Sequence, residues 1–321
     1  MERLGYSMEV NMRFTGAFVA VAMCFSAAQA GAQDVGEAFQ DCDHCPEMMV
    51  IPSGTAVLGS EPWDQDRKGN EGFTREVSIA YKLAVSKYET TRAQFRTFVE
   101  ATGYQTTYQE PRVGCNTWTH DRVIGYVLDH DWDTPGYVQR EDHPAICLSV
   151  EDAVAYIAWL AESTGKPYRM QSSTEFEYAT RAGTRGPWFW GTANSDACEY
   201  ANVADDTFRR LYDYAPVFAC DDGYERTAPV GSFKPNPWGL YDMLGNAWEW
   251  TEDCTHDDMT GVPTDGRAWL EEDDGRCEWR VPRGGAWVSG TDWVRAAAQS
   301  NDHYYYHSQL IGFRVALTLE D

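Results

Sequence analysis

The chain of 321 residues is 43% hydrophobic and 14% aromatic, with 13 tryptophans and 18 tyrosines. This composition excludes an intrinsically disordered protein and provides enough apolar surface for one large domain or two small ones. The formal charge of −24 excludes nucleic acid as an expected partner, because like charges repel and no basic patch is visible to release counterions. Cations suit such a chain better, although most of these carboxylates are expected only to solvate the surface.

The N-terminus has the pattern of an export signal. Arg13 precedes an apolar run over residues 14–28, and small side chains lead up to Ala30. This predicts a signal peptide over residues 1–30, with Met12 as an alternative start. The run is shorter than the roughly 20 residues that cross a membrane as a helix, and no later segment predicts a membrane span. We therefore expect an exported protein, either periplasmic or secreted.

Cysteine usage agrees with export. Without Cys24 in the signal peptide an even number of cysteines remains, which predicts disulfides in an oxidising compartment. The sequence does not choose among the many possible pairings. Joining neighbours closes the shortest loops and gives the pairs Cys42–Cys45, Cys115–Cys147, Cys198–Cys220 and Cys254–Cys277.

The first two cysteines form a CxxC motif, CDHC at residues 42–45, in an N-terminal extension over residues 31–45. A redox pair is one interpretation of this spacing. A structural staple, or half of a zinc site without its other half, is favoured, because no predicted strand precedes the motif and no predicted helix follows it.

Residues 46–321 predict one continuous domain, since no repeat or low-complexity linker divides them. Residues 47–60 alternate between apolar and polar types and end on turn residues, which predicts the start of a hairpin. A helix is predicted after Thr90 or Thr91 as the N-cap, with Gly103 at its end. The apolar face of this helix consists of Phe95, Phe98 and Val99.

A second helix is predicted to begin at Ser149, where Asp152 completes a capping box, and to end at Gly165. Its predicted apolar face consists of Val154, Ile157, Ala158 and Ala161. A third helix begins at Ser172 or Ser173 and ends at Gly183. The chain after about residue 184 is rich in turn-forming residues, which predicts many loops on a few short strands. The fold class is therefore α+β with little regular structure.

The stretch GLYDMLGNAWEWTEDC at residues 239–254 combines carboxylates, turn-formers and tryptophans. Calcium takes about six to eight oxygens from carboxylates and backbone carbonyls. Asp242 and Glu249 supply carboxylates, and Gly245 with Asn246 permits a turn between them. A second set of oxygens is offered by YANVADD at residues 200–206 and CDDGYER at residues 220–226. Solvated turns with aromatic anchors are the alternative, because neither loop has the EF-hand arrangement.

Three motifs occur in the order GLYDMLGNAWEW, RGGAW at residues 283–287 and GFRVAL at residues 312–317. In this order they resemble the sulfatase-modifying-factor family, which includes the formylglycine-generating enzyme. Further matching segments lie at residues 49–60, 88–99, 143–160 and 173–183, so the resemblance spans nearly the whole mature chain. It implies the formylglycine-generating-enzyme fold, with a C-type-lectin-like core, stabilised by calcium and by disulfides.

The resemblance also implies two calcium sites. The ligands of the first are Asn202, the carbonyl of Val203, Asp222 and the carbonyl of Tyr224. The ligands of the second are Asp242, the carbonyls of Gly245 and Ala247, and Glu249. Position 242 is often asparagine in the family, and aspartate keeps an oxygen ligand there while it adds a negative charge.

The copper chemistry of the family is not expected in this chain. The formylglycine-generating enzyme oxidises a client cysteine with O2 at a copper ion held by two cysteine thiolates, which are ligands that suit Cu(I). Ser289 stands where the first thiol is expected, and the segment from there to Arg295 is too short to place the second. Cys254 and Cys277 are an alternative source of thiols, but a disulfide between them is favoured in an oxidising compartment.

Two functions fit the sequence, and it does not decide whether the protein is an enzyme. Exported relatives without the cysteine pair include a factor needed for the oxidative maturation of a siderophore. The first function is therefore maturation of a protein or peptidic client. The second is a non-catalytic, calcium-stabilised module that binds a protein or a glycan through its C-terminal aromatic loop. Either function would use a candidate pocket lined by Trp248, Trp287, Ser289, Trp293, Arg295, Tyr304 and Arg314.

His303 and His307 flank three tyrosines in NDHYYYHSQ. Their spacing would suit a metal on one face of a helix. A loop that presents histidine and tyrosine rings to a ligand is favoured, because such rings provide contact area at low entropic cost. The acidic stretches at residues 256–258 and 271–276 are expected to be solvated loop charge rather than acid–base catalysts.

Overall fold

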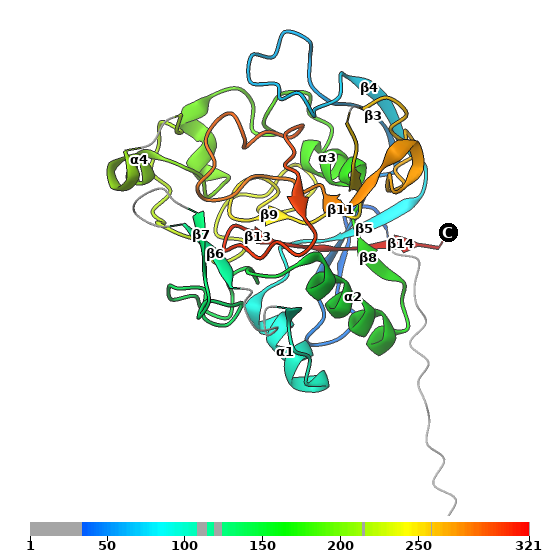
Figure 1. Cartoon of the computed structure of the whole chain (residues 1–321). Helices are drawn as coiled ribbons and strands as arrows, with labels where there is room; N and C mark the ends of the chain where they lie inside the picture. The colour runs from blue at the N-terminus through cyan, green and yellow to red at the C-terminus, as the bar shows by residue number, and fades with distance from the viewer. Residues whose placement is uncertain (1–33, 108–113, 119–123, 214–215, 258, 321) are drawn as a thin grey trace, which may run out of the picture. The chain divides into compact units, whose positions relative to one another are not determined.

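A computed structural model describes residues 34–107, 114–118, 124–213, 216–257 and 259–320. The predicted signal peptide and the alternative start at Met12 lie outside these residues. A five-stranded antiparallel sheet joins the two ends of the described chain (Figure 1). Its strands, in spatial order, are β1 (Ala38–Phe39), β2 (Met48–Ile51), β5 (Lys82–Ser86), β14 (Val315–Leu319) and β8 (Tyr168–Met170).

Both faces of this sheet are covered, which explains why β2 and β5 are apolar at successive positions. Met48 and Val50 belong to a core shared with helices α1 (Arg92–Thr102) and α2 (Val150–Thr164). Met49 and Ile51 point to the opposite side and belong to a second core, shared with α3 (Ser173–Arg181). Figure 1 shows α1 and α2 on one side of the sheet and α3 on the other.

The predicted helix ends are confirmed, because they depend on short-range hydrogen bonds. Thr91 caps α1 in a capping box with Gln94, and Gly103 ends the helix in the left-handed conformation at a φ of 67°. Ser149 and Asp152 form the same motif at the start of α2. Helix α3 begins after Ser172 and ends one residue earlier than predicted, at a left-handed Ala182.

The predicted apolar face of α2 is wrong, with only Ile157 correctly placed. Val154 is 52% exposed, Ala158 is exposed as well and Ala161 is only partly covered. The buried face instead contains Ala153, Tyr156 and Leu160. Tyr156 decides the orientation, because its ring packs against Phe95 and Phe98 of α1 and against Phe313. Apolar residues lie on both faces of this helix, so their periodicity did not identify the one that is buried.

The start of a hairpin predicted over residues 47–60 holds for the second half of that segment, where β3 (Gly54–Leu58) pairs antiparallel with the next strand along the chain, β4 (Arg75–Ile79). Strand β2, which directly precedes β3, pairs instead with β1 and β5. The remaining strands are short, as expected: β6 (Cys115–Trp118) with β7 (Ile124–Val127), β9 (Trp248–Glu249) with β13 (Ile311–Gly312), and β10 (Cys254–Thr255), β11 (Arg276–Arg280) and β12 (Asp302–His303). One further short helix, α4 (Asp206–Tyr212), lies between them in sequence.

Four disulfides join sequence neighbours, in the pairing that the shortest loops suggested: Cys42–Cys45, Cys115–Cys147, Cys198–Cys220 and Cys254–Cys277. All cysteines of the described residues are therefore oxidised. Within the same residues, no helix has the length and apolar character needed to cross a membrane.

Candidate functional site

The two loops that were expected to hold calcium lie against each other. The amide of Asn246 donates to the carbonyl of Asn202 at 2.8 Å, and the Asn202 side-chain amide donates to Asn246 Oδ1 at 3.1 Å. Asn246 has a left-handed backbone, with a φ of 57°, and it follows Gly245 at 83°. This turn directs the asparagine side chain inward, where it links the segment at residue 202 to the segment at residue 246.

A cluster of three buried carboxylates surrounds the second loop. Asp242 and Glu249 were predicted as site residues. The third carboxylate, Glu89, was not predicted; it lies 157 positions before Asn246 in the sequence. Glu89 accepts hydrogen bonds from Asn246 Nδ2 at 2.6 Å and from the amide of Ala247 at 3.0 Å. The signal available in the sequence was a glutamate two residues before Thr91, the N-cap of α1, inside a segment that matched the family.

One guanidinium contacts this cluster, so the charges do not balance. Arg314 donates to both oxygens of Glu249 at 2.6 Å. Burial, together with the neighbouring carboxylates, raises the pKa of Glu89 well above its usual value, and burial raises the pKa of Asp242 to about 6. Three carboxyl groups beside one arginine would carry excess negative charge when ionised, which either a proton or an additional cation would offset.

The first loop repeats this arrangement around Asp222. Its carboxylate accepts hydrogen bonds from the amides of Val203 at 2.8 Å and Tyr224 at 2.9 Å. Burial is the largest cause that raises its pKa to about 7, and the nearby Asp205 adds to it. The carboxyls of Asp205 and Asp222 also lie close to the sulfur of Cys198.

The donor set fits calcium. Asn202 Oδ1 and Asp242 Oδ1 are buried oxygens that find no hydrogen-bond partner among the described residues. Both belong to residues that the family resemblance assigns as ligands, one in each loop. Oxygens that accept few protein hydrogen bonds and lie beside carboxylates are the ligands that calcium prefers. Glu249 and Asp222 already accept hydrogen bonds, but carboxylate oxygens retain further lone pairs for a metal.

The seven residues of the predicted pocket do not gather around one cavity. Trp248 contacts Trp293 edge to face, with 5.9 Å between ring centroids. Trp287 lies in the core beneath Arg226, whose guanidinium is 4.7 Å from the ring centroid. Ser289 is buried in a turn, where its hydroxyl accepts from the amide of Ala286. The other three lie elsewhere: Arg314 pairs with Glu249, Arg295 with Glu71, and Tyr304 beside α2.

The seven residues lie apart because each arginine among them pairs with a buried carboxylate and each ring has its own packing neighbours. An arginine that is 1–2% exposed, like Arg314 or Arg295, must pair with a carboxylate to offset its desolvation. The partners come from distant segments, so closeness in sequence did not predict closeness in space.

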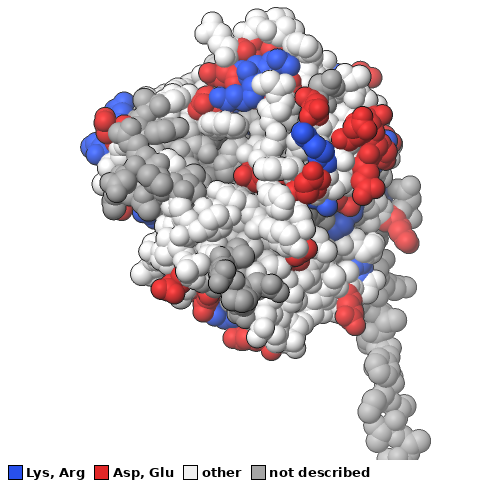
Figure 2. All heavy atoms as spheres, in the orientation of Figure 1, with Lys and Arg blue, Asp and Glu red and all other residues white. Residues whose placement is uncertain are grey.

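One of these residues, Arg295, does line a cavity. The cavity has a volume of about 310 Å³ and lies under the loop between β3 and β4. Its lining includes Trp63, Asp64, Arg181, Arg185, Trp188 and Arg295. The loop that covers it is tied to the segment after residue 291 by Arg295–Glu71 and Lys68–Asp292. Figure 2 shows basic and acidic side chains mixed near this end of the molecule, whereas acidic side chains predominate on the side where Figure 1 shows β11.

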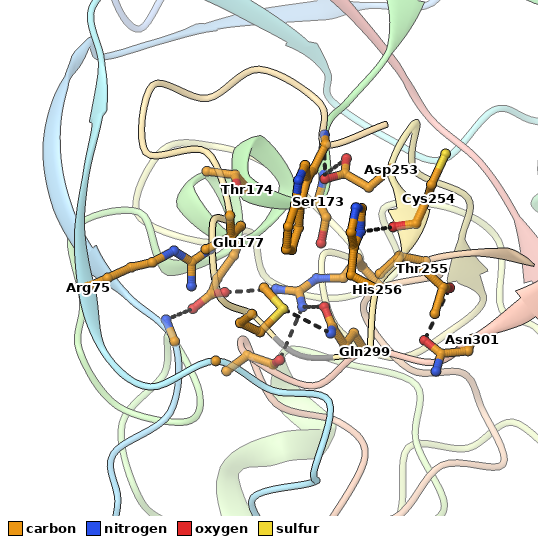
Figure 3. Close-up of a pocket in the computed structure, with 18 residues that line it drawn as sticks. Arg75, Ser173, Thr174, Glu177, Asp253, Cys254, Thr255, His256, Gln299 and Asn301 are labelled. Carbon is orange, nitrogen blue, oxygen red and sulfur yellow. Dashed lines mark hydrogen bonds and ion pairs between the residues drawn. The ribbon is translucent and has the colours of Figure 1, made fainter. Parts of the chain in front are cut away.

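A second cavity is small and is lined by both polar and apolar side chains (Figure 3). Its volume of about 30 Å³ provides room for water but not for a peptide. Asp253 lies at its edge and accepts from the amides of Ser173, at the start of α3, and Trp269. His256 stacks on the ring of Trp269 with 3.4 Å between centroids. Burial raises the pKa of Asp253 to about 7. This residue was not predicted from the sequence.

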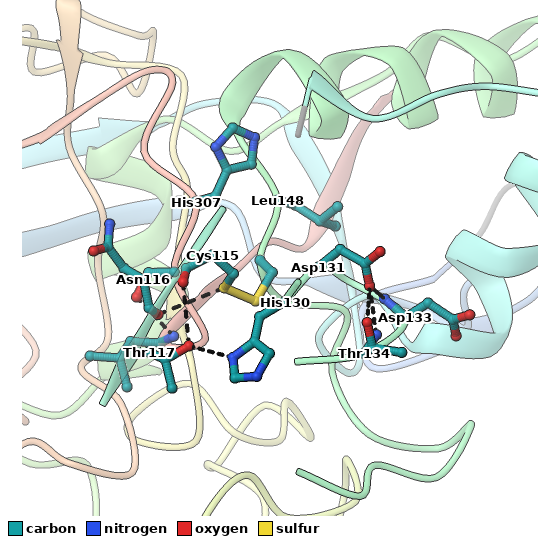
Figure 4. The surroundings of a disulfide bond; sticks show 12 residues. Cys115, Asn116, Thr117, His130, Asp131, Asp133, Thr134, Leu148 and His307 are labelled. Carbon is teal, nitrogen blue, oxygen red and sulfur yellow. Dashed lines mark hydrogen bonds between the residues drawn. A yellow bond between two sulfur atoms is a disulfide. The ribbon is translucent and has the colours of Figure 1, made fainter. Parts of the chain in front are cut away.

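His303 and His307 have separate partners rather than a shared metal. His307 is buried, with Nε2 at 2.7 Å from Thr107 Oγ1 and 3.4 Å from Asp152. It lies near the Cys115–Cys147 disulfide, where its carbonyl accepts from the amide of Asn116 (Figure 4). His303 instead stacks with Tyr304 and Tyr305.

Fold and site together define a class: a disulfide-bonded α+β domain of formylglycine-generating-enzyme type, with long loops and a buried acidic loop pair. The chain matches the family described as "Sulfatase-modifying factor enzyme 1-like domain" over residues 34–319. It is 29% identical over 305 residues to the formylglycine-generating enzyme of Mus musculus, covering 84% of this chain and 74% of that protein. It is also 29% identical over 262 residues to "Inactive C-alpha-formylglycine-generating enzyme 2" of the same organism, covering 74% of this chain and 78% of that protein.

The chain is also similar to a protein of known structure. PvdO from Pseudomonas aeruginosa is 35% identical and superposes with a TM-score of 0.74, covering 90% of this chain and all of that one. The chain therefore belongs to the sulfatase-modifying-factor family.

Proposed function

We propose that this protein is an exported maturation factor that acts on a periplasmic or secreted protein or peptidic client, in an oxidation that does not use a copper–thiolate centre. The observation that carries the proposal is the cavity under the β3–β4 loop. It opens beside the segment that follows the RGGAW motif, where the family's reaction chemistry resides. The disulfide state of every described cysteine supports a route without thiolate ligands and a place in an oxidising compartment.

The cavity suits part of a peptide. Its volume lies at the lower end of the range of small-molecule sites, so it would receive one or two side chains and not a folded domain. Trp63 is 76% exposed and Arg185 is exposed at the same cavity. An aromatic face and a guanidinium bind apolar and anionic parts of a client, respectively.

Calcium is proposed as a structural ion of this factor. The ligands would be Asn202, Asp222 and the carbonyls of Val203 and Tyr224 in one loop, and Asp242, Glu249 and the carbonyls of Gly245 and Ala247 in the other. Bound calcium would neutralise the buried carboxylates and hold the two loops together. It would stabilise the cavity's surroundings and leave the chemical step to other groups.

The maturation function is tested by comparing exported peptides and proteins of a strain that lacks this protein with those of the parent strain, by mass spectrometry. We expect at least one species to be heavier by two hydrogen atoms in the strain that lacks the protein, because the oxidation that removes them in the parent strain does not take place. Re-expression of the wild type should restore the loss, and the Trp63→Ala/Arg185→Ala variant should not. A control variant, Arg209→Ala, changes an exposed arginine outside the cavity. Identical exported fractions in both strains would contradict the proposal.

A binding module is the second candidate, favoured by two observations. One relative bears a name that describes it as inactive. In addition, the aromatic residues Trp279, Tyr305 and Tyr126 are 42–57% exposed near the C-terminal loop. Such rings contact sugars or protein side chains without chemical change. If this function is correct, the immobilised wild type would retain a partner, and the immobilised Trp279→Ala/Tyr305→Ala variant would not. The partner eluted from the wild type would have an unchanged mass.

A further inference from the structure

We propose that Cys42 and Cys45 form a thiol–disulfide exchange site, which accepts two electrons from a cysteine-bearing client in the same compartment. This inference goes beyond the maturation function and does not depend on it. It concerns the N-terminal extension, which neither the calcium loops nor the cavity under the β3–β4 loop involves. The sequence favoured a staple for this motif, but three features of the structure favour exchange.

The first feature is the unequal accessibility of the two sulfurs. Cys45 is 0% exposed, whereas Cys42 is half-buried. Exchange proceeds by attack of an external thiolate on one sulfur, and the rate depends on which sulfur the attacking group can reach. Attack is therefore directed to Cys42, and Cys45 becomes the leaving group. A CxxC pair with one accessible and one covered sulfur has the asymmetry that ordered exchange requires.

The second feature is the histidine inside the motif. A ring nitrogen of His44 lies within 4.8 Å of both sulfurs, and the exposed His44 ring contacts Trp159 of α2. An N–H donor at this position stabilises a thiolate on either sulfur, whether it attacks or departs. Two adjacent carboxylates do not cancel this effect: Lys166 and Tyr168 both donate to Asp41 at 2.6 Å, and Asp43 is exposed to solvent, which screens its charge.

The Cys198–Cys220 disulfide provides a contrast within the same molecule. Both of its cysteines are also half-buried. However, the group of side chains around the Cys198 sulfur contains no histidine among the described residues, whereas the group around Cys42 and Cys45 contains His44. Cys198 therefore lacks the N–H donor that stabilises a thiolate beside Cys42, and exposure alone would not make this disulfide an exchange site.

The third feature is that reduction would disturb little structure. Cys42 and Cys45 are separated by three positions, whereas the other pairs are separated by 22 to 32. The constraint that a disulfide places on the unfolded chain grows with the length of the loop that it closes. The turn has its own hydrogen bonds, from the amide of Cys45 to the carbonyl of Cys42 and from Gln40 to the carbonyl of Cys45. The reduced protein is therefore expected to stay folded, which a reversible site requires.

The chemical step balances as follows. A client thiolate attacks the sulfur of Cys42, the Cys42–Cys45 bond breaks, and the electron pair leaves on Cys45, which takes up a proton. A second thiolate of the same client then attacks the client sulfur of the mixed disulfide and releases Cys42 as a thiolate. The client loses two electrons and gains a disulfide, and the pair becomes a dithiol. A disulfide of the same compartment, such as glutathione disulfide or the disulfide of a partner oxidoreductase, then accepts two electrons from the dithiol. This step restores the Cys42–Cys45 disulfide.

The direction of attack is tested with single-cysteine variants of the mature chain and glutathione disulfide as the probe, with the adduct measured by intact mass. Cys45→Ser leaves Cys42 as the thiol, and Cys42→Ser leaves Cys45. We expect the adduct to form at least tenfold faster on Cys45→Ser than on Cys42→Ser. Cys220→Ser, which leaves the half-buried Cys198, is the matched control and should react as slowly as Cys42→Ser. Equal rates for Cys42 and Cys45, or equal rates for Cys42 and Cys198, would overturn the proposal.

The wild type provides a test that does not depend on how the variants fold. In buffers of reduced and oxidised glutathione, quenched by alkylation, we expect Cys42–Cys45 to open at a reduced-to-oxidised ratio at least tenfold lower than Cys198–Cys220, with an unchanged circular dichroism spectrum. His44→Leu should slow adduct formation on Cys45→Ser severalfold, and His44→Gln, which retains an N–H donor, should restore part of it. Loss of the native spectrum when this pair opens would assign it the role of a staple.

Discussion

At the scale of single residues, the buried carboxyl of Asp253 gives the protein a pH dependence. Burial raises its pKa to about 7, whereas an aspartate in an unfolded chain ionises near pH 4 (about 3.9). Between these values the folded state keeps a proton that the unfolded state has lost. The stability from this group is therefore fully present below about pH 4 and is lost as the pH rises through about 7.

We expect the free energy of unfolding of the wild type to fall with pH more steeply than that of Asp253→Asn, by about 1.4 kcal/mol per pH unit between about pH 4 and pH 7. Urea denaturation of both proteins across this interval measures the two slopes. Asp257→Asn is the control, because the Asp257 side chain is 88% exposed and should leave the slope unchanged. Parallel curves for wild type and Asp253→Asn would show that the buried carboxyl is already ionised.

A second residue-scale prediction concerns the pair beneath the β3–β4 loop. Arg295 and Glu71 are 2% exposed each, and Arg295 also donates to the backbone carbonyl of Asp66 at 2.7 Å. Arg295 has a second, longer pair with the partly exposed Asp64 at 3.3 Å, so removal of Glu71 leaves the buried guanidinium charge only partly compensated. We expect Glu71→Gln to lower the free energy of unfolding by about 3 kcal/mol. The exposed pair Arg209–Asp206 is the control, and Asp206→Asn should cost less than about 1 kcal/mol.

At the scale of an element, α2 presents apolar side chains to both the core and the solvent. We expect Leu160→Ala to destabilise the protein by about 3 kcal/mol, because it leaves a cavity against α1 and the sheet. Val154→Ser should change stability by no more than about 0.5 kcal/mol, because this side chain is exposed. Thermal or urea unfolding of the two variants measures the difference. A large loss for Val154→Ser would mean that the exposed face is covered by a partner or by a second copy of the chain.

At the scale of the whole molecule, calcium would join loops that are far apart in sequence. If the ion binds the folded state alone, a concentration about 100 times its dissociation constant adds roughly 2.7 kcal/mol to the free energy of unfolding. We therefore expect a chelator to lower the melting temperature of the wild type. Asp222→Ala and Asp242→Ala should have lower melting temperatures that no longer respond to calcium. Asp257→Ala, which changes an exposed side chain outside both proposed ligand sets, should respond like the wild type. No response in the wild type would refute structural calcium.

Much of the fold could be predicted where it depends on neighbours in the chain. Thr91 with Gln94 and Ser149 with Asp152 start helices through hydrogen bonds across three residues, so the sequence shows both partners together. The disulfide pairing followed the same rule of closeness. The two loops proposed to bind calcium contact each other, and the structure places Glu89 beside Asn246, although the two residues are distant in sequence.

The sequence by itself determined the helix ends, the scarcity of regular structure after residue 184 and the family, because these follow from local hydrogen bonding and from ordered motifs. Only the tertiary structure decided which face of α2 is buried, which strand pairs with β2, and where the seven residues of the expected pocket lie. Those choices depend on contacts between segments that are far apart in the chain. The packing of Tyr156 and the pairing of each buried arginine with a carboxylate select among alternatives that are equally apolar or equally charged in sequence.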